Sequence, residues 1–350
     1  MIRVLLTSVG GLFSYDTVRA LREKNKFIFV VGVDINPKVN YFFLDRFETV
    51  PKVETSEIKY IKTLIKICKI HRIKYLIPCS DNESLVISKF FDDFKRLGIK
   101  LSVSKYKIAK TMTDKASMFQ YLKEKGIDVG EWRKVNSIND IERQVKFFRK
   151  NKIQIIIKPR KGSGSRGVLI IDESKKKFKD LLDDKTRFCG IGSWKSIKAE
   201  IQNRKASLKE NLIMPYHNND TYDVDCLAKN GEIVLCIPRL RVYDNPLSPT
   251  NQGCIIKNHK QIKNYCSKII KAFNVNGACD FDVVIRKDGK PQILDASCRL
   301  SGSSGASLSI GINVPNSLLR IMSEKSVKPL KLKKTYRVFP KSRFVVDNNF

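Results

Sequence analysis

The sequence is poor in the residues that usually mark a metalloprotein or a disulfide-rich protein. Its 350 residues include three histidines, and its nine cysteines form no Cys-x-x-Cys pair. This spacing gives no support for a zinc site or a disulfide framework, so we expect small, reduced cysteines in the core. Long apolar runs are also missing. None approaches the length of a membrane span, and we expect no membrane partner.

The N-terminal stretch "MIRVLLTSVGGLF" combines one arginine with an apolar run, as a signal peptide does. It lacks a small-residue cleavage site, and it runs directly into the helical pattern "SYDTVRALREK". A first buried strand explains it better, and we expect a cytoplasmic protein.

Acidic residues are few: 35 stand against 67 lysines and arginines, which gives a formal charge of +32. Such a charge is typical of nucleic-acid-binding proteins, and steeply salt-dependent duplex binding would support that alternative. The lysines, however, are dispersed along the whole chain, with no arginine-rich tail and no basic-aromatic motif. We therefore do not expect a nucleic-acid partner, and we infer that the charge attracts small anionic substrates.

Strand and helix patterns alternate through the first third of the chain. Buried-strand patterns occur at "IRVLLTSVG", "FIFVVGVD" and "YLIPCS", and amphipathic helix patterns follow them. This order predicts an α/β domain with a parallel sheet and right-handed crossovers. Sites in such sheets lie at the carboxyl ends of the strands, here residues 8–11, Asp34 and residues 80–83.

Beyond residue 105 the pattern becomes α+β. A helix is predicted at "TMTDKASMFQYLKEKGI", beginning near Thr113 or Asp114. Strands are predicted at "IIIKP", "GVLIID", "NLIMPY", "TYDVDCLA", "EIVLCIP", "GACDFDVVIR" and "KPQILDASCRL". Helices are predicted at "YCSKIIKAFN" and "NSLLRIMSE", and a basic tail without a clear pattern begins near residue 326.

A glycine-rich loop within "KPRKGSGSRGVLII" carries Gly162, Gly164 and Gly167 in a G-x-G-x-x-G pattern. A dinucleotide-binding fingerprint would need a helix after these glycines, but a strand pattern follows. A P-loop needs Lys-Ser or Lys-Thr after its last glycine, and the kinase motifs H-R-D and D-F-G are missing. The pattern favours a β-hairpin flap whose backbone N–H groups approach phosphate oxygens, with an ordinary flexible loop as the alternative. Further donors are the side chains of Lys158, Ser163, Ser165 and Arg166.

Two aspartates are predicted to face each other across a second hairpin. The dipeptide Asp288-Gly289, between two strand patterns, is a strong signature of a two-residue loop. With that loop, Asp282 pairs with Asp295 on one face of the sheet. Opposed side chains have Cβ atoms about 4.5–5.5 Å apart, where like charges destabilise a sheet. A divalent cation such as Mg²⁺ would remove that repulsion, and a solvated strand face is the alternative.

These motifs, in this order over about residues 1–325, resemble the ATP-grasp superfamily, in the branch of the carbamoyl-phosphate synthase large subunit and related carboxylate–amine ligases. The resemblance rests on "MTDKASMFQYLKEKGI", "IIIKPRKGSGSRGV", "YDVDCLAKNGEIVLCIPRLR" and "GACDFDVVIRKDGKPQILDASCRLSGSSG". It implies a Rossmann-like pre-ATP-grasp domain over residues 1–105 and an ATP-grasp domain over residues 106–325. The latter would have a flap-bearing lobe at about 115–212 and a metal-site lobe at about 213–325, followed by the basic tail 326–350.

The resemblance also implies roles for individual residues. The ATP phosphates would be contacted by Lys115 and Lys158 and covered by the loop of Gly162, Ser163, Gly164, Ser165, Arg166 and Gly167. The hinge beside adenine would consist of Ile213, Met214, Pro215 and Tyr216. The metal ligands would be Asp282, Asp295 and Ser297. The catalytic residues would be Arg299, Lys158, Arg239 and Arg241. The implied cofactors are ATP and Mg²⁺, with Mn²⁺ as a substitute.

The chain departs from the family pattern at several points. The usual metal-site pattern ends Leu-Glu-Ile-Asn-Pro-Arg, whereas this chain reads "LDASCR", with Asp295 in place of Glu and Ser297 in place of Asn. The hinge "IMPYHNNDTY" lacks the acidic residue often placed near the ribose, and Thr221 stands where a glutamate is common. These departures bear on metal affinity and turnover rather than on the fold.

The function implied by the resemblance is an ATP-dependent ligase that activates a carboxylate as an acyl phosphate and joins it to an amine. Two alternatives stay open. One is an ATP-grasp enzyme with a carbamate or bicarbonate type of acceptor, and the other is a degenerate, non-catalytic ATP-binding protein. The expected partners are a small-molecule carboxylate and amine, and analogy with the family favours a homodimer.

Overall fold

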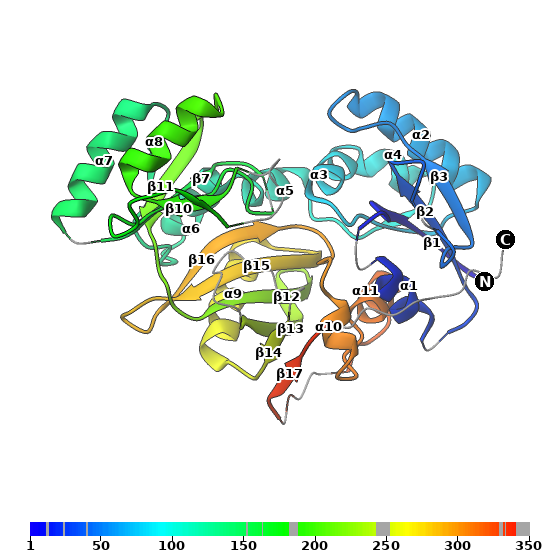
Figure 1. Cartoon of the computed structure of the whole chain (residues 1–350). Helices are drawn as coiled ribbons and strands as arrows, with labels where there is room; N and C mark the ends of the chain where they lie inside the picture. The colour runs from blue at the N-terminus through cyan, green and yellow to red at the C-terminus, as the bar shows by residue number, and fades with distance from the viewer. Residues whose placement is uncertain are drawn as a thin grey trace.

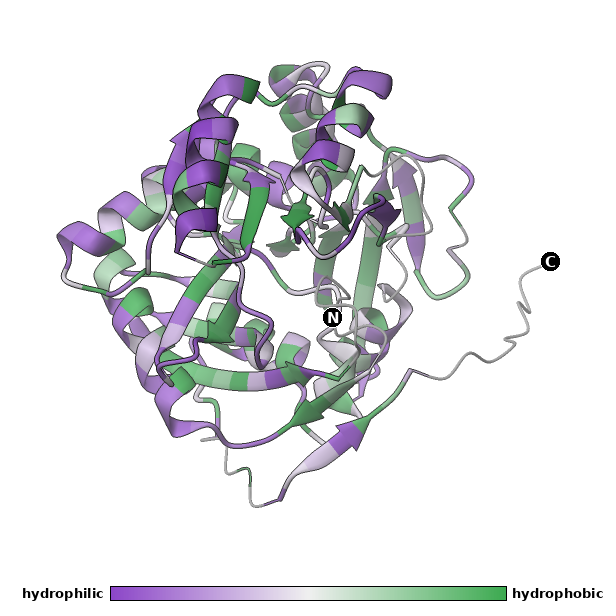
Figure 2. Cartoon of the chain, turned by 60° about the vertical axis from the view of Figure 1, so that its left-hand side comes forward, coloured by the Kyte–Doolittle hydropathy of each residue, from purple (hydrophilic) through white to green (hydrophobic). Residues whose placement is uncertain are grey.

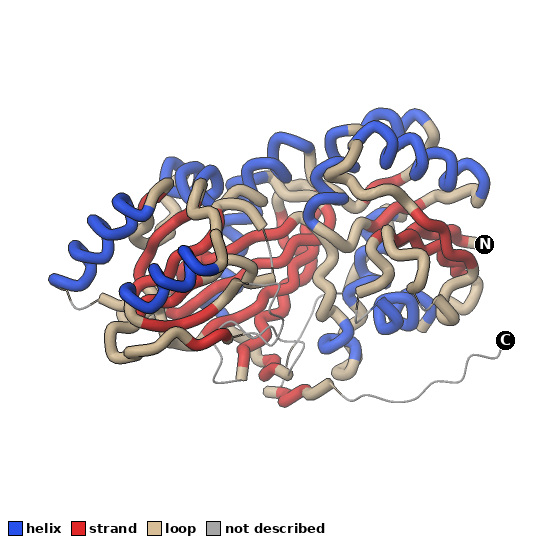
Figure 3. The backbone as a smooth tube through the Cα atoms, turned by 45° about the horizontal axis from the view of Figure 1, so that its top comes forward, coloured by secondary structure: helices blue, strands red, loops and turns tan. Residues whose placement is uncertain are grey.

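The structure, a computed structural model, describes residues 1–11, 14–23, 25–39, 41–151, 153–162, 164–181, 188–242, 253–328, 332 and 334–340. Strands within these ranges form three β-sheets, and most of the helices lie on the outer sides of the molecule (Figures 1 and 3). Among the helices of these ranges, none is long and apolar enough to cross a membrane. The predicted combination of a parallel N-terminal sheet with an α+β remainder is confirmed.

The N-terminal sheet has the strand order β3-β2-β1-β4-β5, and all of its neighbouring strands are parallel. Its strands are β1 (Ile2–Thr7), β2 (Ile28–Asp34), β3 (Arg46–Thr49), β4 (Tyr75–Ile77) and β5 (Lys100–Leu101). Its helices are α1 (Ser14–Arg22), α2 (Glu57–Ile70), α3 (Asp81–Lys89) and α4 (Phe91–Arg96). The short strands β3 and β5 extend the sheet beyond the three strands that the sequence pattern predicts.

The second sheet has the order β6-β11-β7-β8-β10-β9, and with its helices α7 and α8 it is called the flap lobe here. Its strands are β6 (Arg133–Val135), β7 (Ile155–Pro159), β8 (Leu169–Ile171), β9 (Lys179–Asp180), β10 (Gly190–Gly192) and β11 (Asn211–Pro215). The helices of this region are α5 (Tyr106–Met112), α6 (Lys115–Glu124), α7 (Ile138–Lys150) and α8 (Trp194–Asn203). Asp114 caps α6 by accepting a hydrogen bond from Ser117 N, which confirms the predicted start of this helix.

The third sheet is antiparallel, with the order β16-β15-β12-β13-β14-β17. Its strands are β12 (Thr221–Lys229), β13 (Glu232–Arg241), β14 (Cys254–Ile256), β15 (Gly277–Ile285), β16 (Pro291–Ser297) and β17 (Tyr336–Val338). The remaining helices are α9 (Lys260–Phe273), α10 (Gly305–Leu308) and α11 (Val314–Met322). The strand β17 brings part of the basic tail to the edge of this sheet.

The third sheet is buried on both faces, but by different partners. Helices α5, α6 and α9 contribute to an apolar core on one face. On the other face, Leu227 and Ile237 share a core with the N-terminal sheet and with α11. Asn313, the cap of α11, donates a 2.6 Å hydrogen bond to Ala20 O in α1. The helices that follow β16 therefore return to the N-terminal sheet, as the positions of α1, α10 and α11 show in Figure 1. Many residues of the strands are hydrophobic, whereas the outer helices carry more hydrophilic residues (Figure 2).

The hairpin of β15 and β16 forms as predicted, but its turn differs from the prediction. Ile285 pairs with Pro291, and Arg286 N donates to Lys290 O at 2.9 Å. The loop therefore has three residues, 287–289, and the predicted two-residue loop is wrong.

A β-bulge on β16 restores the register that the longer loop would have shifted. Leu294 is the extra residue, because Val283 pairs with Ile293 while Asp282 pairs with Asp295. The predicted facing pair of aspartates is thus confirmed. The loop and the bulge each shift the pairing by one residue, in opposite directions.

Candidate active site

Acidic and basic side chains gather on one face of the third sheet. Because side chains alternate along a strand, residues two apart share a face, and the cross-strand pairing aligns these residues on neighbouring strands. Together with Arg299, just after β16, they are called the ionic cluster here. The cluster consists of Asp223 and Asp225 on β12, Arg239 and Arg241 on β13, Asp280 and Asp282 on β15, and Asp295, Ser297 and Arg299.

Two arginines of the cluster each contact two carboxylates. Arg241 Nε donates to Asp223 Oδ1 at 2.9 Å, and one of its terminal nitrogens lies 3.0 Å from Asp282 Oδ2. Arg299 donates to Asp280 Oδ2 at 3.0 Å. Its Nε lies 3.6 Å from an oxygen of Asp81, at the start of α3. Protein cations therefore offset much of the repulsion that the facing aspartates would otherwise have.

Arg239 lies entirely inside the protein, with an exposed fraction of 0%. Its guanidinium donates to Asp225 Oδ1 at 2.7 Å and to the carbonyl and hydroxyl of Ser303 at 2.9 and 2.7 Å. These bonds fix the loop that follows β16. Arg239 is thus the most buried charged residue of the cluster, and a direct contact with substrate stays a prediction.

Asp282 and Asp295 are the most accessible carboxylates of the cluster. Their side chains are 33% and 27% exposed, whereas those of Asp223, Asp225 and Asp280 are 8%, 3% and 14% exposed. Burial and the neighbouring aspartates outweigh Arg241 and raise the pKa of Asp282 to about 7. The two predicted metal ligands are therefore the carboxylates of the cluster that solvent reaches best, and a cation bound there would offset their charge.

Two buried lysines reach the third sheet from the region of the flap. Lys115 Nζ lies 3.0 Å from Asp295 Oδ2 and donates to Gly162 O at 2.8 Å. Lys158 Nζ donates to Leu294 O, next to Asp295, at 2.6 Å. Burial and the positive charge of Lys115 outweigh the nearby aspartates and lower the pKa of Lys158 to about 8. Lys115 and Lys158, which the resemblance assigns to the ATP phosphates, thus lie beside Asp295, one of the predicted metal ligands.

The glycine-rich loop connects β7 and β8, which pair antiparallel as a hairpin flap. Gly162, Gly164 and Gly167 have φ values of 112°, 68° and 73°, which residues with side chains rarely adopt. Arg160 fixes the base of the flap by donating to Asp114 Oδ1 at 2.6 Å. Of the other predicted donors, Ser165 is partly buried and Arg166 is exposed on the flap, while Ser163 lies outside the described residues.

The predicted adenine hinge forms the end of β11 and the start of the link to β12. Ile213 and Met214 are fully buried and pack in two apolar cores. Pro215 and Tyr216 are partly buried, and Tyr216 N donates to Gln154 O at 2.8 Å. A base bound here would therefore meet Pro215, Tyr216 and the backbone rather than the side chains of Ile213 and Met214.

The carboxyl ends of the N-terminal strands also converge, as the sequence predicts. Glu83, in α3, is 5% exposed and accepts hydrogen bonds from Thr7, Ser80 and Tyr60 at 2.6, 2.7 and 2.9 Å. One residue further, Ser84 Oγ donates to Cys298 O at 2.5 Å. These contacts hold α3 against the segment that follows β16, so that Asp81 reaches the ionic cluster.

Sequence reasoning did not assign Asp223, Asp225 or Asp280 to the site, and it named Asp81 only within residues 80–83, at the end of a strand. The two on β12 had a signal: in "TYDVDCLA" they alternate with residues that are buried on the opposite face. Asp81 comes from another domain-like region, and only the packing of α3 brings it to Arg299.

Two family models match the chain. Residues 207–344 match a family described as ATP-grasp in the biosynthetic pathway with Ter operon, and residues 4–102 match the PylC-like, N-terminal domain. A search of curated proteins returned no match. The first segment contains the whole ionic cluster, and the second contains Asp81 and the N-terminal sheet apart from the first two residues of β1.

Solved structures with a similar fold are enzymes of low sequence identity. The L-amino acid ligase of Bacillus licheniformis is 11% identical, with a TM-score of 0.64, over 91% of this chain and 73% of that chain. The N5-carboxyaminoimidazole synthetase of Staphylococcus aureus, complexed with ADP, is 13% identical, with a TM-score of 0.67, over 94% and 79% of the two chains.

A third similar structure is the biotin carboxylase domain dimer of Hydrogenobacter thermophilus 2-oxoglutarate carboxylase, in complex with MgADP, ADP and bicarbonate. It is 15% identical, with a TM-score of 0.66, over 94% of this chain and 71% of that chain. The likeness to the carbamoyl-phosphate synthase large subunit stands as a resemblance to a related branch. The two matched segments lead to one conclusion: residues 207–344 belong to an ATP-grasp domain and residues 4–102 to a PylC-like N-terminal domain.

Proposed function

We propose that this protein is an ATP-dependent ligase that activates a carboxylate as an acyl phosphate and joins it to an amine. The observation that carries the proposal is the position of Lys115, whose ammonium contacts both Gly162 O of the flap and Asp295 of the third sheet. A triphosphate held under the flap would have its terminal phosphate beside the acids. This is the geometry that phosphoryl transfer needs, because positioning and charge supply most of its catalysis.

The residues present suit ATP and Mg²⁺. Asp282 and Asp295 offer the most accessible oxygens of the cluster, with Ser297 two residues beyond Asp295 on the same face. An all-oxygen set of this kind suits Mg²⁺, which commonly binds through one or two carboxylates plus substrate phosphates. When bound, ATP supplies the phosphoryl group and Mg²⁺ offsets its charge.

The chain's own residues would do the remaining work. The ammonium groups of Lys115 and Lys158 would offset negative charge as it develops on the transferred phosphoryl group. Arg299, held by Asp280 and Asp81, would orient the carboxylate that accepts it. The flap would exclude water from the acyl phosphate until the amine attacks. No side-chain nucleophile is required in this scheme.

We further propose domain limits of 1–105 for the N-terminal domain and 106–325 for the ATP-grasp domain. The flap-bearing lobe would cover about 115–212 and the metal-site lobe about 213–325, ahead of the basic tail 326–350. A homodimer and a cytoplasmic location remain expectations from the sequence.

The test is an assay of ADP release with ATP and Mg²⁺ across a panel of carboxylates and amines, combined with mass spectrometry of the products. The proposal expects ADP release that depends on both substrates, and a product with a new amide bond. ADP release that bicarbonate alone supports would favour the alternative acceptor. Tight ATP binding without substrate-dependent ADP release would instead identify a non-catalytic ATP-binding protein.

A further inference from the structure

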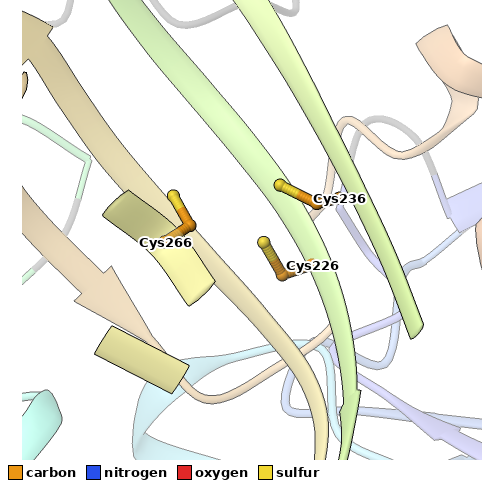
Figure 4. A group of neighbouring side chains, drawn as sticks. All are labelled: Cys226, Cys236 and Cys266. Carbon is orange, nitrogen blue, oxygen red and sulfur yellow. The ribbon is translucent and has the colours of Figure 1, made fainter. Parts of the chain in front are cut away.

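Three thiols converge in the apolar core on the face of the third sheet opposite the ionic cluster (Figure 4). Cys226 on β12 and Cys236 on β13 are cross-strand partners, and Cys266 comes from α9, which packs over them. Their Sγ atoms all lie within 4.8 Å of one another. The three residues are at most 5% exposed, so the group is closed to solvent.

We propose that Cys226, Cys236 and Cys266 form a buried structural site for a thiophilic d¹⁰ cation, either Zn²⁺ or Cu⁺. Thiolate ligands select these soft ions over Mg²⁺ and Ca²⁺. A Zn–S bond of about 2.3 Å gives neighbouring sulfurs a separation of roughly 3.8 Å in a tetrahedral site. The observed limit of 4.8 Å exceeds this separation by about 1 Å, so the three sulfurs would have to move slightly closer together to bind one ion.

A further cysteine of this core, Cys279, distinguishes the two ions. Cys279 on β15 is the cross-strand partner of Cys226 on the side away from Cys236. It is 2% exposed, and its thiol lies within hydrogen-bonding reach of the Cys226 thiol. Structural Zn²⁺ sites have four ligands, so Zn²⁺ would also need Cys279, which lies two strands from Cys236 and would have to move to join the other three. Cu⁺ accepts three thiolates, and the group of three would be sufficient for it.

Binding of the cation is an exchange of protons. Each metal–sulfur bond replaces an S–H bond, and the proton leaves to the solvent. Lys263 lies one helical turn before Cys266 on α9 and would offset part of the negative charge of a metal–thiolate group.

The spacing of the cysteines in the sequence does not indicate this site, because its ligands come from two strands and a helix. Residues 226, 236 and 266 contain no Cys-x-x-Cys pair, which is why the spacing alone gave no support for zinc. The site does not depend on the proposed ligase activity, since its residues face away from the ionic cluster. Its test can therefore succeed or fail independently of the test of function.

The test uses the full chain, reduced and freed of metal with a chelator, in excess Mg²⁺ to occupy oxygen sites. Titration with Zn²⁺ and, separately, with Cu⁺ against a chromophoric competitor measures affinity and stoichiometry. We expect one tightly bound ion per chain. X-ray absorption spectroscopy then counts the sulfur ligands, and four for Zn²⁺ or three for Cu⁺ are expected.

Variants localise the ion. Cys266→Ala should weaken binding at least a hundredfold, whereas Cys279→Ala should weaken binding of Zn²⁺ but not of Cu⁺. The matched control is Cys68→Ala, which removes a buried cysteine from the N-terminal domain. If Cys266→Ala does not fold, Cys266→Val keeps the volume of the core and serves in its place.

Two results would overturn the site. One is a wild-type protein that takes neither ion from the chromophoric competitor. The three thiols would then serve only in packing. The other is binding that survives unchanged in Cys266→Ala or Cys266→Val, which would place the ion elsewhere.

Discussion

The two faces of the third sheet are built from alternate residues of the same strands, yet they differ in physical character. On β15, Asp280 and Asp282 belong to the ionic cluster, while Cys279, Phe281 and Val283, which alternate with them, are buried in an apolar core. One face carries basic and acidic side chains in contact with one another, and the other is an apolar core that excludes water. Neighbouring residues of one strand therefore have different roles: one belongs to the proposed active site, and the next packs in the core.

This difference predicts that the faces respond differently to substitution. On the ionic face, a change of charge should alter turnover while the fold persists, because arginines and lysines already compensate the carboxylates. On the apolar face, a lost side chain should lower the free energy of unfolding, because the core cannot collapse fully around a cavity. The following changes test that contrast, beginning with the largest expected effect.

Replacing Asp295 by asparagine should have the greatest effect on turnover. Asp295→Asn keeps the size of the side chain but removes the charge opposite Asp282 and beside Lys115. We expect ADP release to fall by about 10³-fold, the scale of losing one preorganised electrostatic group. Steady-state ADP release at saturating Mg²⁺ measures this.

The control for this change is Asp92→Asn, at an exposed position of α4. It removes the same charge far from the cluster and should leave turnover unchanged. Near-normal ADP release in Asp295→Asn would refute the assignment of the two facing aspartates.

Phe281→Ala should be the most damaging change on the apolar face. Phe281 is 0% exposed and lies between Asp280 and Asp282 in the sequence. Its removal should cost about 3–5 kcal/mol of unfolding free energy, as for other buried aromatic residues. Denaturant unfolding measures the loss, and ADP release per folded molecule should stay within a few-fold of wild type. A specific loss of turnover in fully folded protein would contradict the separation of the faces.

Lys158→Met should lower activity and raise the stability of the fold. We expect ADP release to fall by about 10²-fold through the loss of a positive charge at the phosphates. The pKa of Lys158, about 8, lies below the value of about 10.4 for an exposed lysine, so its buried charge opposes folding at pH 7. Methionine removes that cost together with the bond to Leu294 O, and a net gain of about 1 kcal/mol is expected.

The sign of this stability difference depends on pH in a definite way. Because folding lowers the pKa of Lys158, its destabilising effect is complete below about pH 8 and disappears as the pH approaches the unfolded value. Thermal unfolding of wild type and Lys158→Met should therefore differ most at pH 7 and converge above pH 10. A difference that grows with pH would show that Lys158 is not a buried cation.

The same titration predicts a change in ATP affinity. Above about pH 8, ligand-free Lys158 loses its proton, and a neutral amine binds phosphate less strongly than an ammonium. The KM for ATP should rise by up to about tenfold between pH 7.5 and 9.5. Lys158→Arg keeps its charge over this range and should flatten the profile. Parallel profiles for both proteins would assign the pH dependence to another group.

The contrast between the faces also explains what the sequence could predict. Alternation in "GACDFDVVIR" was sufficient to place Asp280 and Asp282 on one face, because the period of a strand is fixed. The pairing of Asp282 with Asp295 was predicted from a two-residue turn, and it holds because the bulge offsets the longer loop. The actual turn of three residues and the bulge at Leu294 were not predictable, since turn and bulge compensate each other only in three dimensions. Short strands such as β3 and β5 carry too few residues to show a period.

Contacts between distant segments were equally beyond sequence reasoning. Arg239 matched a motif that often meets substrate, but its burial against Asp225 and Ser303 depends on how the loop after β16 returns to β13. The approach of Asp81 to Arg299 depends on the packing of α3. Cys226, Cys236 and Cys266 appeared scattered for the same reason.

The smallest expected effect concerns Ser297, where the usual family pattern has asparagine. Ser297 lies opposite Asp280 on the ionic face, while Cys298, the next residue, is buried in the apolar core. Ser297→Ala should raise the Mg²⁺ concentration needed for half-maximal ADP release by about threefold, the scale of one weak oxygen contact. Cys298→Ala is the matched change on the other face: it should lower stability and leave the Mg²⁺ requirement unchanged. An equal Mg²⁺ response in both variants would mean that Ser297 belongs to the packing of the sheet and not to the cation site.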